Sequence, residues 1–169
     1  LCYEIQNIQD SDRKSRDKMN LLKPYSLKIM AGVLFHKLDD NQWQYINSGN
    51  VVDNSDRLWQ AVFSLSSNMT SDCTFVGGIN LMSSKRTKVR VTLGRQGSTE
   101  WEGLSQDIQL LPNSVQSVQL SHKFTKQHTA LKVQAEILEI EASDMVDITI
   151  DNVYVSESLI PLIRVFRDN

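Results

Sequence analysis

Apolar and polar residues alternate along most of the chain, and a period of two is typical of a β-strand with one buried face. Short segments rich in glycine, asparagine, aspartate and serine separate the alternating stretches, as turns separate strands. No long amphipathic helix lies between them, which excludes parallel βαβ units. The pattern therefore predicts nine to ten short strands in an antiparallel sandwich or barrel. The stretches with strand character lie at 3–8, 24–30, 43–46, 58–65, 75–82, 88–93, 99–110, 118–124, 131–137 and 146–155.

The last of these stretches contains a slip in its alternation. Every second residue is apolar up to Ile150, the pattern fails at Asp151–Asn152, and it resumes at Val153. Such a slip predicts a β-bulge, because one extra residue restores the alternation on the same face. Residues 130–142 also contain good helix formers, but their period of two and the neighbouring strands favour a strand.

Length and charge limit the classes of protein to consider. The chain has 169 residues, enough for one domain with a sizeable core, and its net charge of −2 gives no global field for nucleic acid or an anionic membrane. No apolar run approaches the roughly 18 residues of a membrane-spanning helix. We therefore expect neither a nucleic-acid partner nor a membrane span. The chain begins at Leu1, and we interpret it as a processed product or an excised domain, with a β-sandwich domain at 1–158 and an edge strand or linker at 159–169.

Residue types that commonly carry catalysis lack the spacing that such sites need. His36, His122 and His128 show no metal-ligand spacing, and no nucleophile, zinc or phosphate-loop motif is present. We therefore expect no enzymatic activity, and we expect His122 in the core because it is in phase with the apolar residues of its strand. Cys2 and Cys73 match neither a metal site nor a redox motif. A disulfide between them is one alternative, but two buried thiols are what we expect.

The aromatic residues are the main candidates for a ligand site. All three tryptophans stand in polar surroundings: NQWQY, DRLWQAV and STEWEGL. An exposed indole offers a flat face to the CH groups of a sugar, while nearby polar side chains can bond its hydroxyl groups. The alternative is that the rings belong to the core, which the flanking Leu58 and Ala61 favour for the middle tryptophan. The candidate ligand-binding residues are Trp43, Trp59, Trp101, Tyr45, Gln60, Asn41, Gln42 and Glu102.

Several stretches resemble, in order, strands of the carbohydrate-binding modules of families 4, 9 and 22. VDITIDNVYV at 146–155 is similar to their last strand, apolar-Asp-apolar-x-Ile-Asp-(Asp/Asn/Ser)-Val-x-Val. YSLKI at 25–29 resembles an early YSLKV strand, LWQA at 58–61 a WQG segment, and KVRVTL at 88–93 a VxVTL strand. The resemblance covers about residues 25–157. It implies a single antiparallel β-sandwich of the jelly-roll type, with the shape of galactose-binding domains.

The resemblance is incomplete at the start of the chain. The family's opening Asn-x-x-Phe-Glu followed by Gly-Trp is absent, and a charged loop stands there instead. Family members often hold a structural calcium between that Glu and the Asp of the last strand. Asp151 matches the Asp, but no residue clearly supplies the Glu, so a structural calcium stays open and no other cofactor is expected. Among the tryptophans, only Trp59 falls on a motif position.

The resemblance implies a non-catalytic module that binds a glycan or polysaccharide. We expect it to be extracellular or secreted, and to belong to a larger protein with neighbouring domains. A protein-interaction or accessory sandwich is the alternative, in which the tryptophans would be core residues or interface anchors. A viral jelly-roll structural protein is a third, because one fold can host many functions. Exposure of the indoles separates these hypotheses, since a sugar site needs at least one ring open to solvent.

Overall fold

The computed structural model describes residues 25–47, 53–69, 72–96, 100–141 and 144–158. These residues form ten β-strands and one short 3-10 helix. The elements are β1 (Tyr25–Ala31), β2 (Phe35–Asp39), β3 (Gln42–Ile46), η2 (Asn54–Arg57), β4 (Leu58–Met69), β5 (Cys73–Ser83), β6 (Thr87–Arg95), β7 (Gly103–Leu110), β8 (Gln116–Phe124), β9 (His128–Ile140) and β10 (Met145–Glu157).

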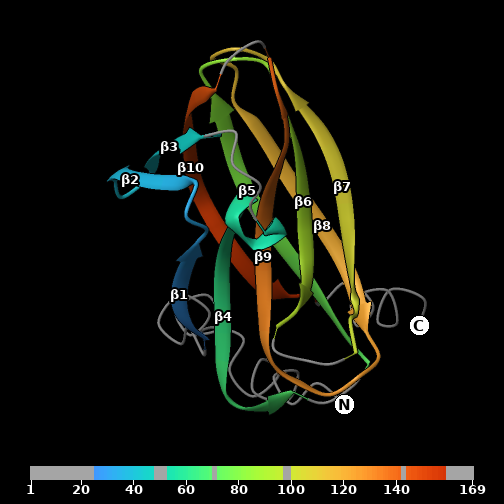
Figure 1. Cartoon of the computed structure of the whole chain (residues 1–169). Coiled ribbons are helices and arrows are strands. Elements are labelled where there is room, and N and C mark those ends of the chain that lie inside the picture. Colours follow the sequence, from blue (N-terminus) through green and yellow to red (C-terminus); the bar gives the residue numbers. More distant parts are fainter. Residues whose placement is uncertain (1–24, 48–52, 70–71, 97–99, 142–143, 159–169) are drawn as a thin grey trace, which may run out of the picture.

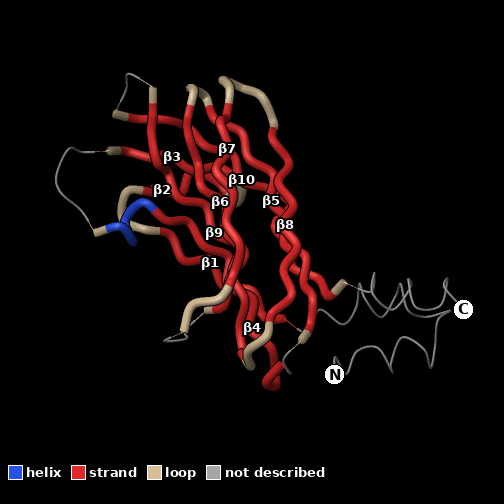
Figure 2. The backbone as a smooth tube through the Cα atoms, turned by 90° about the vertical axis from the view of Figure 1, so that its right-hand side faces the viewer, coloured by secondary structure: helices blue, strands red, loops and turns tan. Residues whose placement is uncertain are grey.

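Two five-stranded antiparallel sheets pack face to face (Figures 1 and 2). Sheet A has the order β1-β4-β9-β6-β7, and sheet B has the order β2-β3-β10-β5-β8. Strands from distant parts of the chain are neighbours: β9 lies between β4 and β6, and β10 lies between β3 and β5. The predicted antiparallel sandwich of the jelly-roll type is confirmed.

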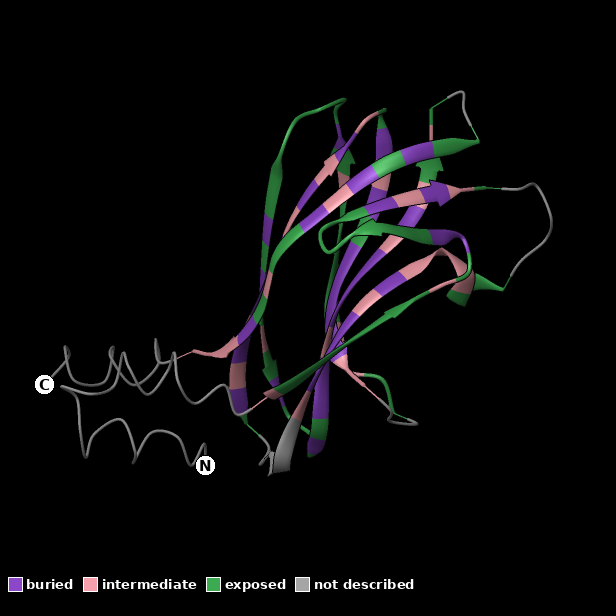
Figure 3. Ribbon diagram, turned by 90° about the vertical axis from the view of Figure 1, so that its left-hand side faces the viewer, coloured by how far each residue is buried: buried purple, intermediate pink, exposed green. Residues whose placement is uncertain are grey.

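Alternate side chains fill the space between the sheets, so buried and exposed residues alternate along the strands (Figure 3). In β10 the buried residues are Val146, Ile148 and Ile150, as the period of two predicted. In β9 they include Leu131 and Val133, which confirms the prediction of a strand over a helix for this stretch. These inward positions fix which residues of each strand point away from the core and are available to a ligand.

The bulge predicted in the last strand is present. The register of β10 against β5 shifts between Asp151 and Tyr154, and Asn152 has a φ of 49°. Asparagine tolerates this left-handed conformation better than most residues do. Beyond the bulge, the ring of Tyr154 lies over Gly78, where an added Cβ would be 2.2 Å from Cε1 of the tyrosine.

Cys73, the first residue of β5, is disulfide-bonded, so the prediction of two buried thiols is wrong. The missing motif misled the prediction, because disulfide formation depends on how closely the fold brings two Cα atoms together. Cys2, the predicted strand at 3–8 and the segment 159–169 lie outside the described residues. Within the described ranges, no helix has the length and apolar character needed to cross a bilayer.

Candidate functional site

Two of the three candidate indoles belong to the core. Trp43 is 6% exposed and Trp59 is 3% exposed, and their rings meet edge to face with centroids 6.3 Å apart. Tyr45 is also buried. The polar neighbours of Trp43 misled the prediction, because β3 begins at Gln42 and the residue two positions earlier is not part of the strand. These three aromatic residues are therefore structural, and their assignment to the ligand surface is wrong.

Small residues around Trp59 explain how its indole fits between the sheets. Its partner on β1 is Ala31 and its partner on β9 is Ala135, while Ala61 follows two positions along β4. Alanines on three sides leave the volume that a bicyclic ring needs in a close-packed interior. This cross-strand information is absent from the local sequence, which shows only Leu58 and Ala61 near the ring.

Trp101 is the exposed indole that the sugar hypothesis requires. It is 60% exposed and precedes β7, the edge strand of sheet A. Gly103, two residues later, pairs with Gly94 of β6. A Cβ placed on Gly103 would lie 3.1 Å from Cζ2 of Trp101. The ring therefore stands beside a pair of glycines at the border of sheet A.

The row of residues that contains this glycine pair continues across the outer face of sheet A. Gly94 is paired with Lys132 of β9, and Lys132 is paired with Val62 of β4. A Cβ on Gly94 would lie 3.7 Å from Cε of Lys132. The lysine is half-buried, and this burial lowers the pKa of its ammonium group.

The next row is uncharged and rich in hydrogen-bonding groups. It runs from Ser105 through Thr92 and Gln134 to Gln60. The hydroxyl groups of Thr92 and Ser105 are 2.7 Å apart and hydrogen-bonded. Gln134 is only 8% exposed, and its buried Oε1 has no hydrogen-bond partner among the described residues. Gln60 is a predicted site residue that the fold does place on the same face as Trp101.

A third row carries charge. Arg90 donates to Asp107 from Nε at 2.7 Å and from Nη2 at 3.2 Å, and it is also paired across the strands with Glu136. The hydrogen bond from Arg90 is the main cause that lowers the pKa of the Asp107 carboxyl. Because the donor and the acceptor are both partly exposed, this pair orders side chains more than it stabilises the fold.

We call the outer surface formed by these rows the polar face; its residues are Trp101, Gly94, Gly103, Lys132, Ser105, Thr92, Gln134, Gln60, Asp107, Arg90 and Glu136. No other sheet of the described residues packs over it, since sheet B lies on the opposite side of sheet A (Figure 2). Even so, the side chains of Thr92 and Gln134 at its centre are buried. On the outer face of sheet B, Asp147 of the central strand β10 is exposed, while Thr149 and Asn80 are partly buried. The polar face therefore has buried polar groups at its centre.

Glu102 has a different role from the predicted one. Its side chain is 13% exposed. The carboxylate accepts hydrogen bonds from the backbone N–H groups of Thr125 and Lys126 and from the Thr125 hydroxyl, with distances of 2.9–3.2 Å. Burial alone would raise the pKa of Glu102, but these donors lower it overall. His122 has the inward phase of its strand, but its side chain is 25% exposed and lies at the border of the core rather than inside it as predicted, with Nε2 3.5 Å from the same carboxylate. Glu102 therefore stabilises the turn between β8 and β9. Its carboxylate already accepts hydrogen bonds from the protein and is not available to a ligand.

The remaining predicted site residues lie away from Trp101. Asn41 and Gln42 are exposed on the β2–β3 hairpin, at the opposite end of the molecule from the start of β7 (Figure 1). Asp151 is exposed, and its Oδ1 accepts the Asn152 N–H at 2.7 Å. Among the described residues, no group of three or more His, Cys, Asp and Glu side chains could hold a metal ion. The opening segment that the calcium of the family would also need lies outside these residues.

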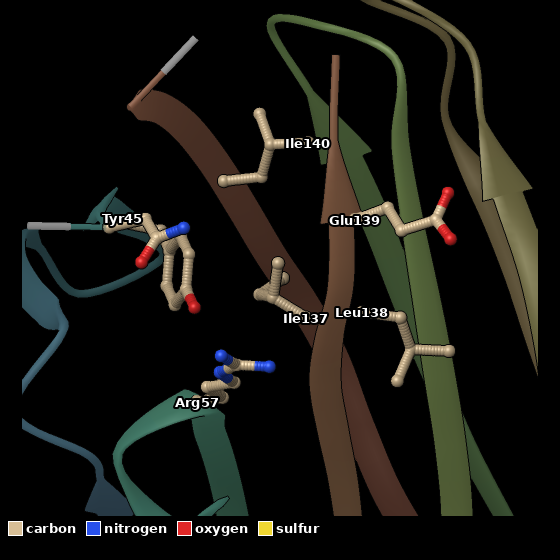
Figure 4. A pocket seen from close by; sticks show the side chains of 7 residues that line it. Tyr45, Arg57, Ile137, Leu138, Glu139 and Ile140 are labelled. Carbon is tan, nitrogen blue, oxygen red and sulfur yellow. The ribbon is translucent and has the colours of Figure 1, made fainter. Parts of the chain in front are cut away.

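A small cavity separates Tyr45 and Arg57 from the end of β9 (Figure 4). Its volume is about 120 Å³, well below the roughly 300 Å³ at which small-molecule pockets begin. Burial raises the pKa of the Tyr45 hydroxyl, and the nearby Arg57 opposes that effect. At this volume the cavity is too small to hold a sugar.

Comparisons with known proteins bear on the fold. The chain matches no family model and no curated protein sequence. It is similar to the structure described as "CBM4 structure and function", at 10% identity and a TM-score of 0.56, over 77% of this chain and 94% of that one. It is also similar to "BiXyn10A CBM1 APO", at 11% identity and a TM-score of 0.50, over 79% of this chain and 91% of that one. At these identities the likeness shows a shared β-sandwich fold.

Proposed function

We propose that this chain is a non-catalytic carbohydrate-binding module and that the polar face holds the glycan. The position of Trp101 carries the proposal: an indole that is 60% exposed borders a set of buried polar side chains, on a sheet face over which no other described strand packs. Small-molecule sites combine apolar surface with a few placed polar groups in this way. The other two tryptophans support the site only by filling the core beneath sheet A.

The groups on this face match those of a sugar ring. A sugar presents CH groups on its flat sides and hydroxyl groups around its edge. The indole of Trp101 supplies apolar surface for the CH groups, and the side chains of Gln60 and Ser105 donate to and accept from hydroxyl groups. The buried Thr92 hydroxyl orients that of Ser105. Gln134 Oε1 lacks a donor, and a rotation of its amide would present this acceptor to a ligand hydroxyl. A buried acceptor without a partner costs free energy, so such a bond would favour binding.

The class of protein has further support. The solved structures with the same fold are described as CBM4 and as the CBM1 of BiXyn10A, and the strand motifs of this chain resemble the same kind of module. We infer that the ligand is a glycan or polysaccharide, that the protein is extracellular or secreted, and that it acts beside further domains. The disulfide at Cys73 fits an oxidising compartment.

Replacing Trp101 with Ala tests the proposal. Affinity electrophoresis through gels containing soluble polysaccharides, with a glycan array for oligosaccharides, measures retention of the wild-type protein and the variant. We expect Trp101→Ala to weaken binding about 10-fold or more, because exposed aromatic anchors commonly contribute over 1.4 kcal/mol. Leu111→Ala is the matched control, since Leu111 is another exposed apolar residue that lies outside the polar face.

Two results would overturn the proposal. One is a wild-type protein that binds no glycan of either panel, which would favour a protein-interaction module. The other is a Trp101→Ala variant that binds as tightly as the wild-type protein, which would move the site elsewhere. Unchanged circular dichroism and thermal unfolding of the variant exclude a loss of binding through misfolding.

A further inference from the structure

Lys132 is a half-buried cation on the polar face, in the row that contains the glycine pair. It lies on β9, the central strand of sheet A, between Val62 on β4 and Gly94 on β6. Neither neighbour carries charge or a side-chain hydrogen-bonding group. A lysine ordinarily extends its ammonium group into water, because burying a charge without a partner is unfavourable.

No described carboxylate forms an ion pair with Lys132. The acidic residue of its own strand on the same face is Glu136, four residues away, or about 13 Å at 3.3 Å per residue. Glu136 lies opposite Arg90, which in turn holds Asp107. The acids of the polar face are thus grouped around Arg90. The lowered pKa of Lys132 agrees with a cation that burial destabilises and that no carboxylate compensates.

In the row that runs from Lys132 to the border of sheet A near Trp101, the intervening positions carry no side chain. The two residues that separate them are the paired glycines, Gly94 and Gly103. Any Cβ at Gly94 would approach the lysine Cε, and any Cβ at Gly103 would approach the indole. The glycines therefore leave bare backbone between an aromatic ring and an ammonium group, which face the same side of sheet A.

We propose that the glycan is acidic, and that a uronic acid residue bound at Trp101 places its carboxylate against the ammonium group of Lys132. This inference rests on the proposed function. The sugar ring would cover the glycine pair with its CH face on the indole, and the carboxylate would give Lys132 the partner that the described residues do not supply. A charge-assisted hydrogen bond at a partly buried site is stronger than one in bulk water.

The test compares acidic glycans with their neutral counterparts. Polygalacturonate, alginate and glucuronoxylan are each measured beside a carboxyl-reduced preparation of the same polymer, by affinity electrophoresis and by titration calorimetry with their oligosaccharides. We expect at least one acidic form to bind about 10-fold more tightly than its reduced form at low salt. The preference should shrink in 0.5 M NaCl, because salt screens the ion pair.

Two lysine variants assign the preference to the site. Lys132→Met keeps the apolar stem and removes the charge, so it should bind the acidic and the reduced forms alike. Lys132→Arg should keep part of the preference. Lys28→Gln removes the same charge from an exposed lysine beyond Val62 in the same row, and it should keep most of the preference. If Lys28→Gln loses as much of the preference for the acidic glycan as Lys132→Met does, the preference depends on net charge alone and the assignment to Lys132 is wrong.

The outcomes separate this inference from the proposed function. Equal binding of acidic and reduced forms, with binding lost in Trp101→Ala, would overturn the acidic ligand and leave a module for neutral glycans. Binding to neutral glycans alone would also overturn the acidic ligand and leave a module for neutral glycans. A wild-type protein that binds neither acidic nor neutral glycans would overturn both. Lys132→Met removes an uncompensated cation, so we expect it to unfold at the wild-type temperature or above.

Discussion

Replacing Glu102 with Gln gives a quantitative test of the turn that follows β8. The carboxylate accepts hydrogen bonds from Thr125 N, Thr125 Oγ1 and Lys126 N while being only 13% exposed. Hydrogen bonds to a charged group contribute about 1.5–3 kcal/mol, but glutamine keeps one acceptor and water reaches the exposed donors. We therefore expect Glu102→Gln to lower the free energy of unfolding by about 1–2 kcal/mol at pH 7. For a chain of this size that is roughly 2–8 °C in Tm.

The effect should depend on pH in a defined direction. The pKa of Glu102 in the folded protein lies below its ordinary value near 4.3. A lowered pKa means that the carboxylate stabilises the fold above about pH 4.3, and that this stability is lost as the pH falls through the lowered value. The difference in stability between the wild-type protein and Glu102→Gln should thus be largest at pH 7 and smaller at pH 3.

Urea unfolding at both pH values, followed by circular dichroism, measures the difference. Glu100→Gln is the matched control, because Glu100 forms an exposed ion pair with Lys126 and should change stability much less than Glu102→Gln. The imidazole of His122 lies 3.5 Å from Glu102 and could add its own pH dependence. Measuring Glu102→Gln against its parent with both carrying His122→Gln removes that contribution. A difference of equal size at pH 3 and pH 7 would refute the role of the ionised carboxylate, and so would its absence at pH 7.

Three further predictions concern the core and its borders. Trp59→Ala should cost about 3–5 kcal/mol, because its indole fills a buried space between alanines, and an unchanged Tm would contradict the core assignment. Gly78→Ala should lower the free energy of unfolding by about 1–3 kcal/mol, since a Cβ there would clash with the Tyr154 ring. Gly94→Ala is the control: its Cβ would lie 3.4 Å from the nearest atom, so thermal unfolding should show little change in Tm. Burial lowers the pKa of His128, so the unfolded chain takes up the proton first and stability falls as the pH drops below about 6.5. His128→Gln should therefore lose less stability than the wild-type protein between pH 7 and pH 5, and an equal loss would show that His128 is not responsible.

The strands could be predicted from the sequence because a half-buried strand shows its period directly. The alternation from Val146 to Ile150 and the slip at Asp151–Asn152 led to a strand and a bulge that the structure confirms. The stretch now seen as β9 was predicted correctly for the same reason, despite its helix-forming composition. Local periodicity is enough for these features, since one strand determines its own inward and outward positions.

The site could be predicted only in part, because it depends on which strands become neighbours. The local sequence shows Lys132 and Gln134 as polar positions of a strand, but the register against β6 places them beside Gly94 and Thr92. Trp43 has polar neighbours in sequence and an apolar surrounding in space, including Trp59 from the other sheet. Glu102 bonds a turn 23 residues later. None of these pairings has a signature in a single strand.

Quenching of tryptophan fluorescence tests the central claim most directly, because the chain has three tryptophans and the fold exposes Trp101 while burying Trp43 and Trp59. Acrylamide should quench one accessible component in the free protein, and Trp101→Phe should remove that component. A bound glycan that covers the polar face should protect the same component and shift its emission to shorter wavelength. Binding that leaves the accessible component fully open to acrylamide would contradict a sugar site at Trp101.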